Sequence, residues 1–177
     1  MAHQPAAFGF FLSLLMRALF VFAVASVCLF QTAEASLPKV DKLKAAYMYN
    51  FTRFISWPAD HPQPLVFCVQ QPTDFVAFFH ALINSKPGRD KRNDLRIIEL
   101  SAAARCDLAY LPGPQIDFPA LTPATLIITD APAPPGLAAV FTFYQEHNRL
   151  RFEIDTAQSE RLNLTISSEL LKVAKIK

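Results

Sequence analysis

The feature of this sequence that most constrains the fold is a set of short apolar runs separated by stretches of helical periodicity. Pro64–Val69 (PLVFCV) is a continuous run of β-forming residues, which is typical of a strand covered on both faces. Before it, Lys39–Ser56 repeats apolar residues every three or four positions, and after it comes Thr73–Asn84 with the same period. Both segments are predicted to be helices. This alternation favours an α/β fold with a mainly parallel sheet.

The remaining apolar runs complete a predicted single-domain α/β sandwich, in which helices flank a mainly parallel sheet and an antiparallel hairpin lies near the C-terminus. Further strands are predicted at Leu95–Leu100, Cys106–Leu111, Ala124–Thr129, Ala138–Tyr144 and Arg149–Asp155, the last two forming the hairpin. Two short helices are predicted at Ala157–Asn163 and Ser167–Ile176. The helix Thr73–Asn84 is expected to bury Phe75, Phe78, Phe79 and Leu82.

Residues 1–35 are predicted to be a signal peptide rather than part of the fold. An apolar run, Ala18–Phe30, follows Arg17, and Ala33-Glu34-Ala35 is the small-x-small pattern after which signal peptidase cleaves. The run is too short for an ordinary transmembrane helix, so no stable membrane span is expected after cleavage. We therefore expect a periplasmic protein, cleaved near Ala35, with one domain over residues 36–177.

The cysteine count then becomes informative. Once the leader is removed, Cys68 and Cys106 remain, and an even number of cysteines in an exported chain favours a disulfide. Both residues fall on or beside predicted strands, and adjacent strands lie about 5 Å apart, which is within the range that a disulfide bridges. The alternative is two separate buried thiols.

Composition and motifs argue against a nucleic-acid partner and against a familiar enzyme. The 17 basic and 15 acidic residues give a formal net charge of +2, and no basic run is long enough to neutralise a row of phosphates. Motifs of zinc peptidases, serine hydrolases and phosphate-binding loops are absent from the sequence, so we expect no enzyme activity, no metal and no cofactor.

Three acidic residues stand at the ends of predicted strands, where doubly wound folds collect ligands: Asp107, Asp130 and Asp155. We favour a capping role for them in turns and helices. Asp130 is the one most worth inspecting as a functional residue. An exported hydrolase that uses Asp107 or Asp130 remains a minor hypothesis.

Several segments together carry a resemblance to a known family. They are the helix KAAYMYNFTRFISWP (44–58), the strand with Cys68, the segment RCDLAYL (105–111), and the closing pair RFEID (151–155) and ISSELLKVA (166–174). In this order they cover nearly all of the predicted domain. The chain resembles the YfiR-like family of bacterial periplasmic proteins.

The resemblance implies a function that composition does not show. YfiR-like proteins are periplasmic repressors that bind the sensor domain of an inner-membrane diguanylate cyclase, which lowers cyclic-di-GMP synthesis and biofilm matrix production. They tend to form homodimers, and Cys68 and Cys106 match the family's strand-to-strand disulfide pair. The second pair of cysteines that some members carry near the C-terminus is absent here.

Two kinds of binding remain open for this chain. The first is a protein partner held on an apolar surface, for which the loop Ala131–Leu137 (APAPPGL) is a candidate. The second is a small-ligand sensor or carrier with a cleft formed by Arg53, Trp57 and the start of the predicted last helix, Ser167 and Ser168. For Trp57 itself we favour a different role, which is to fill the edge of the core.

Overall fold

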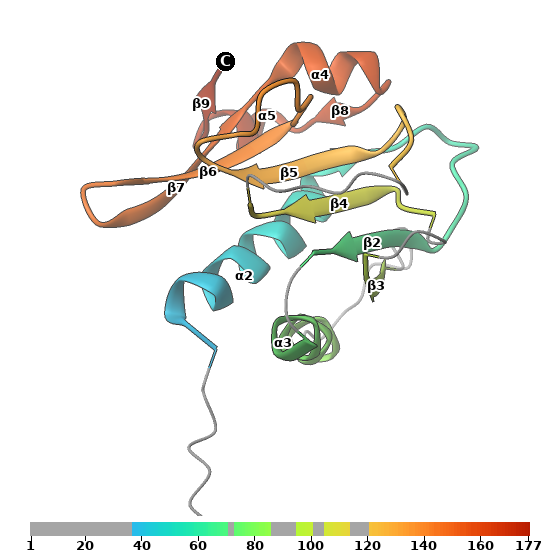
Figure 1. The fold of residues 1–177 in the computed structure, drawn as a ribbon. Helices are drawn as coiled ribbons and strands as arrows, with labels where there is room; N and C mark the ends of the chain where they lie inside the picture. The colour runs from blue at the N-terminus through green and yellow to red at the C-terminus, as the bar shows by residue number, and fades with distance from the viewer. Residues whose placement is uncertain (1–36, 71–72, 86–94, 101–104, 114–120) are drawn as a thin grey trace, which may run out of the picture. The chain divides into compact units, whose positions relative to one another are not determined.

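The structure is a computed structural model, and it describes residues 37–70, 73–85, 95–100, 105–113 and 121–177. In these ranges it has helices and strands in the order that α/β proteins show (Figure 1). The elements are α2 (Lys39–Phe54), β1 (Ile55–Ser56), β2 (Leu65–Val69), α3 (Thr73–Asn84), β3 (Leu95–Glu99), β4 (Leu108–Leu111), β5 (Leu126–Asp130), β6 (Phe141–Glu146), β7 (Arg149–Ile154), α4 (Thr156–Arg161), β8 (Thr165–Ile166), α5 (Ser168–Leu171) and β9 (Lys175–Ile176). Residues 1–36, which include the predicted signal peptide (residues 1–35), lie outside the described ranges.

The main sheet has seven strands in the order β3-β2-β4-β5-β6-β7-β9. The first five of these are mutually parallel, and β7 then runs antiparallel to β6. The last strand, β9, pairs parallel to β7, and a separate two-stranded antiparallel pair joins β1 to β8. The predicted α/β class with a mainly parallel sheet and an antiparallel hairpin is confirmed.

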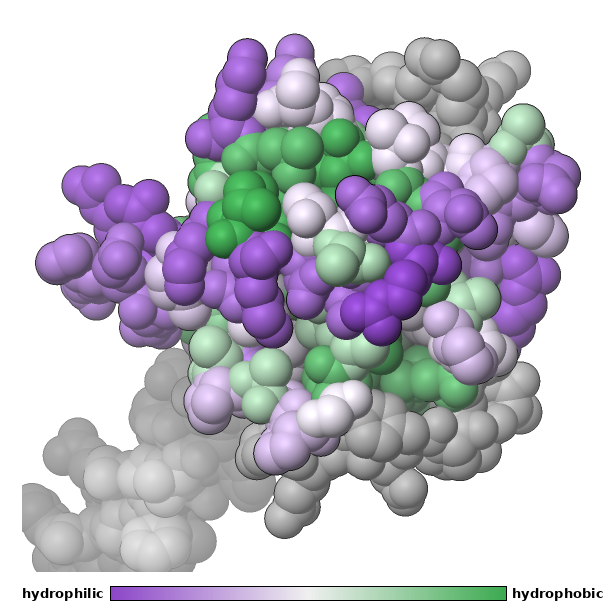
Figure 2. All heavy atoms as spheres, turned by 90° about the horizontal axis from the view of Figure 1, so that it is seen from above, coloured by the Kyte–Doolittle hydropathy of each residue, from purple (hydrophilic) through white to green (hydrophobic). Residues whose placement is uncertain are grey.

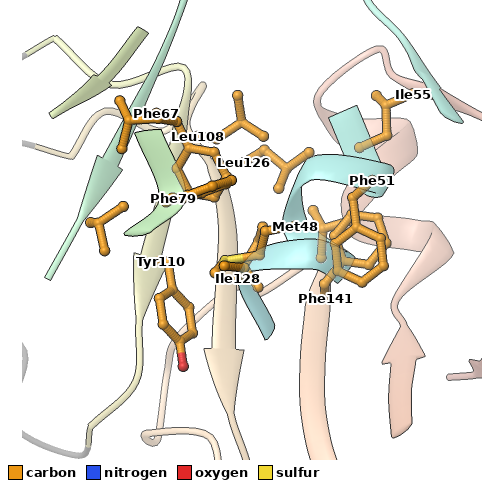
Figure 3. Packing of buried hydrophobic residues seen from close by; sticks show 14 of the residues in the cluster. Met48, Phe51, Ile55, Phe67, Phe79, Leu108, Tyr110, Leu126, Ile128 and Phe141 are labelled. Atoms are coloured by element: carbon orange, nitrogen blue, oxygen red, sulfur yellow. The ribbon is translucent and has the colours of Figure 1, made fainter. Parts of the chain in front are cut away.

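Helices α2 and α3 pack on the same face of this sheet. The ring of Phe51 on α2 stacks on Phe141 of β6 with centroids 4.2 Å apart, and Phe79 on α3 meets Phe67 of β2 edge to face at 5.4 Å. Figure 3 shows Met48 and Phe51 reaching from α2 toward the strand residues Ile128 and Phe141. The core is therefore a layer of aromatic and aliphatic side chains between these helices and the sheet.

The disulfide predicted from the cysteine count is present. Cys68 of β2 is bonded to Cys106, which stands just before β4; their Cα atoms are 5.6 Å apart and 38 residues apart in sequence. Both side chains are buried, and β2 pairs directly with β4, so the bond links two neighbouring strands. The alternative of two separate thiols is wrong.

The hairpin of β6 and β7 turns through His147 and Asn148, which have φ angles of 48° and 60°. Two consecutive residues with positive φ define the tight turn whose twist matches that of paired strands. On β7, Phe152 and Ile154 face the core, while Arg151 and Glu153, which alternate with them, face away from it.

Three details of the predicted elements are corrected by the structure. The helix predicted over Lys39–Ser56 ends at Phe54, because Ile55 and Ser56 pair with Ile166 and Thr165 instead. The helix predicted over Ser167–Ile176 has one turn only, Ser168–Leu171, since Lys175 and Ile176 join the sheet beside β7. On α3, Phe78 and Leu82 are only half-buried, and the helix buries Val76 and Ile83 together with Phe75 and Phe79.

Candidate functional site

The acidic residue singled out in the sequence, Asp130, is the centre of a polar cluster at the carboxyl end of the sheet. It is the last residue of β5, and its carboxylate accepts a hydrogen bond of 2.7 Å from Lys44 Nζ on α2. The hydroxyl of Tyr110, on neighbouring β4, lies 3.1 and 3.2 Å from the two carboxylate oxygens and donates to them. Lys44 Nζ also lies 3.8 Å from Asp41 Oδ1, one helical turn earlier.

These groups are shielded from water to an unusual extent for charged side chains. Lys44 is 13 % exposed, and Asp41 and Asp130 are each 22 % exposed. The cluster counts two carboxylates against one ammonium group, so it carries a net charge of −1 when all three are ionised. Because solvent screening is weak around partly buried charges, this excess is felt by whatever lies next to the cluster.

What lies next to it is a cavity of about 270 Å³. Its walls come from α2, the end of β5, and the β6–β7 hairpin, and the residues that line it are Lys44, Asp130, Ala131, Phe143, Tyr144, Gln145 and Leu150. The cavity lies where ligands of open α/β sheets gather, beyond the carboxyl ends of parallel strands. We call it the Asp130 cavity.

At the opposite, amino end of the strands, Asp107 has a structural role. Its side chain is 4 % exposed and accepts hydrogen bonds from Val66 N at 2.8 Å and from Arg105 Nη2 at 2.9 Å. His61 Nε2 lies 3.2 Å from Asp107 Oδ1 without the alignment of a hydrogen bond, and the His61 ring packs on Trp57 at 4.5 Å between centroids. The buried carboxylate is thus neutralised and tied to β2.

Asp155 caps a helix, as expected. Its carboxylate Oδ1 accepts from the backbone N–H of Gln158 at 3.0 Å, in the first turn of α4. The capping interpretation is therefore confirmed for Asp155 and, in the wider sense of satisfying a backbone donor, for Asp107. Asp130 differs from both, because its partners are side chains from other elements.

The residues predicted to form a ligand cleft lie around the end of α2. Ser167 N–H donates to Phe54 O at 2.8 Å, so the β1–β8 pair brings Ser167 beside the residue that follows Arg53. Arg53 is exposed with its guanidinium 6.0 Å from the Tyr49 ring centroid, whereas Trp57 is half-buried against His61. Ser167 caps α5, and Ser168 opens it. With a single turn, α5 has little macrodipole to offer an anion, and binding by these four residues stays a prediction.

A second surface of interest was not predicted as such. Val173 is 68 % exposed and Ile176 is 50 % exposed, which is high for large apolar side chains. They stand on the C-terminal segment 171–177, where α5 leads into β9. Figure 2, viewed from above, shows hydrophobic side chains gathered on this side of the molecule with hydrophilic groups around them. We call this the α5–β9 surface.

Sequence reasoning missed the role of Lys44. Lys44 lies within the predicted first helix, and Asp130 is 86 residues away from it in the chain. A single sequence holds no signal for that pairing. The exposure of Val173 and Ile176 was not predicted for a different reason. Both residues fall in the helix predicted over Ser167–Ile176, whereas the structure has a single helical turn followed by β9.

Comparison with protein families gives the identity at family level. The model of the YfiR/HmsC-like family matches residues 41–175, from the first turn of α2 to the first residue of β9. The chain belongs to the YfiR/HmsC-like family, whose members are periplasmic regulators rather than enzymes. Among curated proteins, none matches the chain.

Two observations on the described ranges complete the picture of the site. None of their helices combines the length and apolar character that a membrane crossing requires. In the same ranges, no group of three or more His, Cys, Asp or Glu side chains is placed to hold a metal ion.

Proposed function

We propose that this protein represses an inner-membrane diguanylate cyclase by binding its periplasmic sensor domain, and thereby lowers cyclic-di-GMP and biofilm matrix production. The observation that carries the proposal is the family match over residues 41–175. The Cys68–Cys106 disulfide supports it, because such bonds persist in an oxidising compartment such as the periplasm.

The α5–β9 surface is the proposed contact for the sensor domain. Large apolar side chains exposed together mark interaction sites more often than they occur by accident, and Val173 and Ile176 are the two most exposed of the large apolar residues in the described ranges. Lys172 is exposed beside them, and Lys175 is already paired with Glu153 at 3.0 Å. An apolar centre with a polar rim is the usual anatomy of a protein interface.

Repression then follows from differential binding. A bound protein shifts the equilibrium of its partner only by the difference between its affinities for the active and inactive arrangements. We infer that the protein binds the inactive arrangement of the sensor domain more tightly. Since this requires no chemical step, the proposed function needs only a stable surface.

Deletion of the gene should raise cyclic-di-GMP and surface attachment, and wild-type protein supplied in trans should lower both again. Val173→Asp and Ile176→Asp should fail to complement while the variants remain folded and exported. Leu43→Asp is the matched control, because Leu43 is 44 % exposed but stands on α2. Cyclic-di-GMP that stays unchanged in the deletion strain under several growth conditions would contradict the proposal.

We also propose that the protein forms a homodimer, as its family resemblance implies. Sedimentation velocity on the exported protein over a range of concentrations would measure this directly. A monomer at all concentrations up to the solubility limit would count against it.

A small-ligand sensor or carrier is the second candidate function. It is favoured by a cavity of about 450 Å³ near the amino end of β5, whose lining includes Thr125, Ile127, Gln158 and Arg161. That volume is within the roughly 300–1,000 Å³ of small-molecule sites. A thermal-shift screen of metabolites tests it, and a reproducible stabiliser at micromolar concentration would favour this candidate.

A further inference from the structure

We propose that the Asp130 cavity binds a small organic cation, a primary ammonium group on a short apolar chain, with the ammonium group on the carboxylate of Asp130. This inference is independent of the proposed function, and it concerns the opposite end of β6 from the α5–β9 surface. The cavity is lined by Gln145 and Leu150, which pair across the hairpin, whereas β9 joins the sheet at Ile154.

The sign of the ligand charge follows from the cluster. Lys44 is the ammonium group of the site, and it faces Asp130 at 2.7 Å and Asp41 at 3.8 Å, which leaves one negative charge in excess. An anionic ligand would raise the excess to −2 and would compete with Asp130 for Lys44. A cationic ligand brings the total to zero in a place where solvent compensates charge poorly.

Asp130 can also take another hydrogen bond. An ionised carboxylate offers about four acceptor positions. Oδ2 accepts from Lys44 Nζ and both oxygens are within reach of the single hydroxyl proton of Tyr110. The carboxylate therefore keeps room for a further N–H donor, and the Tyr110 hydroxyl holds it in a fixed orientation for that donor.

The remaining walls offer both apolar and polar surface to the short chain that carries the ammonium group. Phe143 and Leu150 supply apolar surface, and Gln145 supplies an amide at the hairpin side. The volume of about 270 Å³ is just below that of pockets for drug-sized ligands, so the ligand is a compact one. Lys175, whose Nζ is 5.7 Å from the Tyr144 ring centroid, does not offset the excess, because it is paired with Glu153.

The experiment titrates the exported, purified protein with three probes of similar size at constant salt: butylammonium, butyrate and 1-butanol. Amide chemical shifts of Ala131 and Gln145 report on the cavity. We expect saturable binding of butylammonium, with a dissociation constant on the order of 1 mM for so small a ligand, and at least tenfold weaker binding of the other two. Tighter binding of butyrate, or no saturable shift with butylammonium, would overturn the proposal.

Three variants locate the binding and separate it from a general charge effect. Asp130→Asn should weaken butylammonium binding at least tenfold, while Glu160→Gln, the same charge change on an exposed residue of α4, should leave it unchanged. Lys44→Met should strengthen it at least threefold, because the ligand then replaces the resident ammonium group between two carboxylates. If Asp130→Asn does not fold, the Lys44→Met variant still tests the proposal. Weaker binding of butylammonium by Lys44→Met than by the wild type would refute a cation site.

Discussion

Aromatic packing supports both halves of the seven-stranded sheet, but only one half also has a covalent cross-link. On the β2–β4 side, a disulfide joins Cys68 to Cys106. On the β6–β7 side there is no cysteine, and Phe51 of α2 packs against Phe141, Phe143 and Phe152 at centroid distances of 4.2, 5.7 and 4.9 Å. A cross-link acts mainly by restricting the unfolded chain, whereas ring packing acts in the folded state. The comparison teaches that reduction of the disulfide should weaken the β2–β4 half of the sheet, whereas the packing of the β6–β7 half does not depend on redox conditions.

The largest effect is expected from the ring cluster. Phe51→Ala removes a fully buried side chain that α2 inserts against three rings of the sheet, and it should lower the free energy of unfolding by about 3–5 kcal/mol. Urea denaturation monitored by circular dichroism measures this. Phe51→Leu is the control, because it keeps much of the apolar volume and should recover most of the loss. A loss below about 1 kcal/mol in the alanine variant would show that the rings are not the main support of this half.

The disulfide comes next. Cys68→Ser or Cys106→Ser should lower the free energy of unfolding by about 2–4 kcal/mol, since a closed loop of 38 residues restricts the unfolded chain considerably. Reduced wild-type protein should melt close to the variants. The two single variants and the double variant should also agree with one another, because they remove the same bond. Equal melting temperatures of oxidised and reduced wild type would contradict the division into two halves.

A smaller effect is expected at the end of the hairpin half, where Asp155 caps α4. Asp155→Ala should cost about 1 kcal/mol of the free energy of unfolding, because the N–H of Gln158 loses its acceptor. Asp155→Asn should restore most of it, since asparagine caps as well as aspartate. Both Asp155→Ala and Asp155→Asn remove the ion pair between the Asp155 carboxylate and Lys177 Nζ, which are 3.8 Å apart. If both variants lost the same stability, that ion pair rather than the cap would be responsible.

The smallest effect belongs to the outer edge of the same half. The pKa of Lys175 is raised above its usual 10.5, chiefly because its ammonium group donates a hydrogen bond to Glu153. A pKa that is higher in the folded state contributes stability below the unfolded pKa and loses it as pH rises through the folded value. The weak stabilisation should therefore be present at neutral pH and disappear in strongly alkaline solution.

Titration of the Lys175 side chain by NMR checks this, with Glu153→Gln as the comparison. The substitution should lower the pKa of Lys175 toward its usual value and leave the melting temperature at neutral pH almost unchanged, because exposed ion pairs contribute little. A Lys175 pKa that is the same in both proteins would exclude Glu153 as the cause.

Much of this fold could be predicted from local patterns. The helix α3 begins and ends where the sequence indicated, and the continuous apolar run at Leu65–Val69 is a central strand. The strands β1, β8 and β9 could not be predicted, because two residues are too few to show a period. The last predicted helix was wrong for a related reason. Lys175 and Ile176 are acceptable in a helix, but the free edge of β7 offers them backbone partners that a local pattern does not contain.

The candidate site was predictable in part as well. Asp130 was marked by its place after a buried strand, which in α/β folds is informative. Its partners Lys44 and Tyr110 come from elements 86 and 20 residues away, and only the completed sheet brings them together. The predicted burial of Phe78 and Leu82 on α3 was wrong for a similar reason. Which side of α3 faces the core depends on how α2 packs beside it, and the local pattern does not contain that information.

The pairing of β9 with β7 has a consequence for fusion proteins. Lys177 N–H donates to Ile154 O, so the residue that follows β9 still takes part in the pairing. No unpaired spacer therefore separates this edge of the sheet from residue 177. An affinity tag fused after Lys177 would place extra chain directly beside the α5–β9 surface, whereas β3, at the other edge of the sheet, would be unaffected.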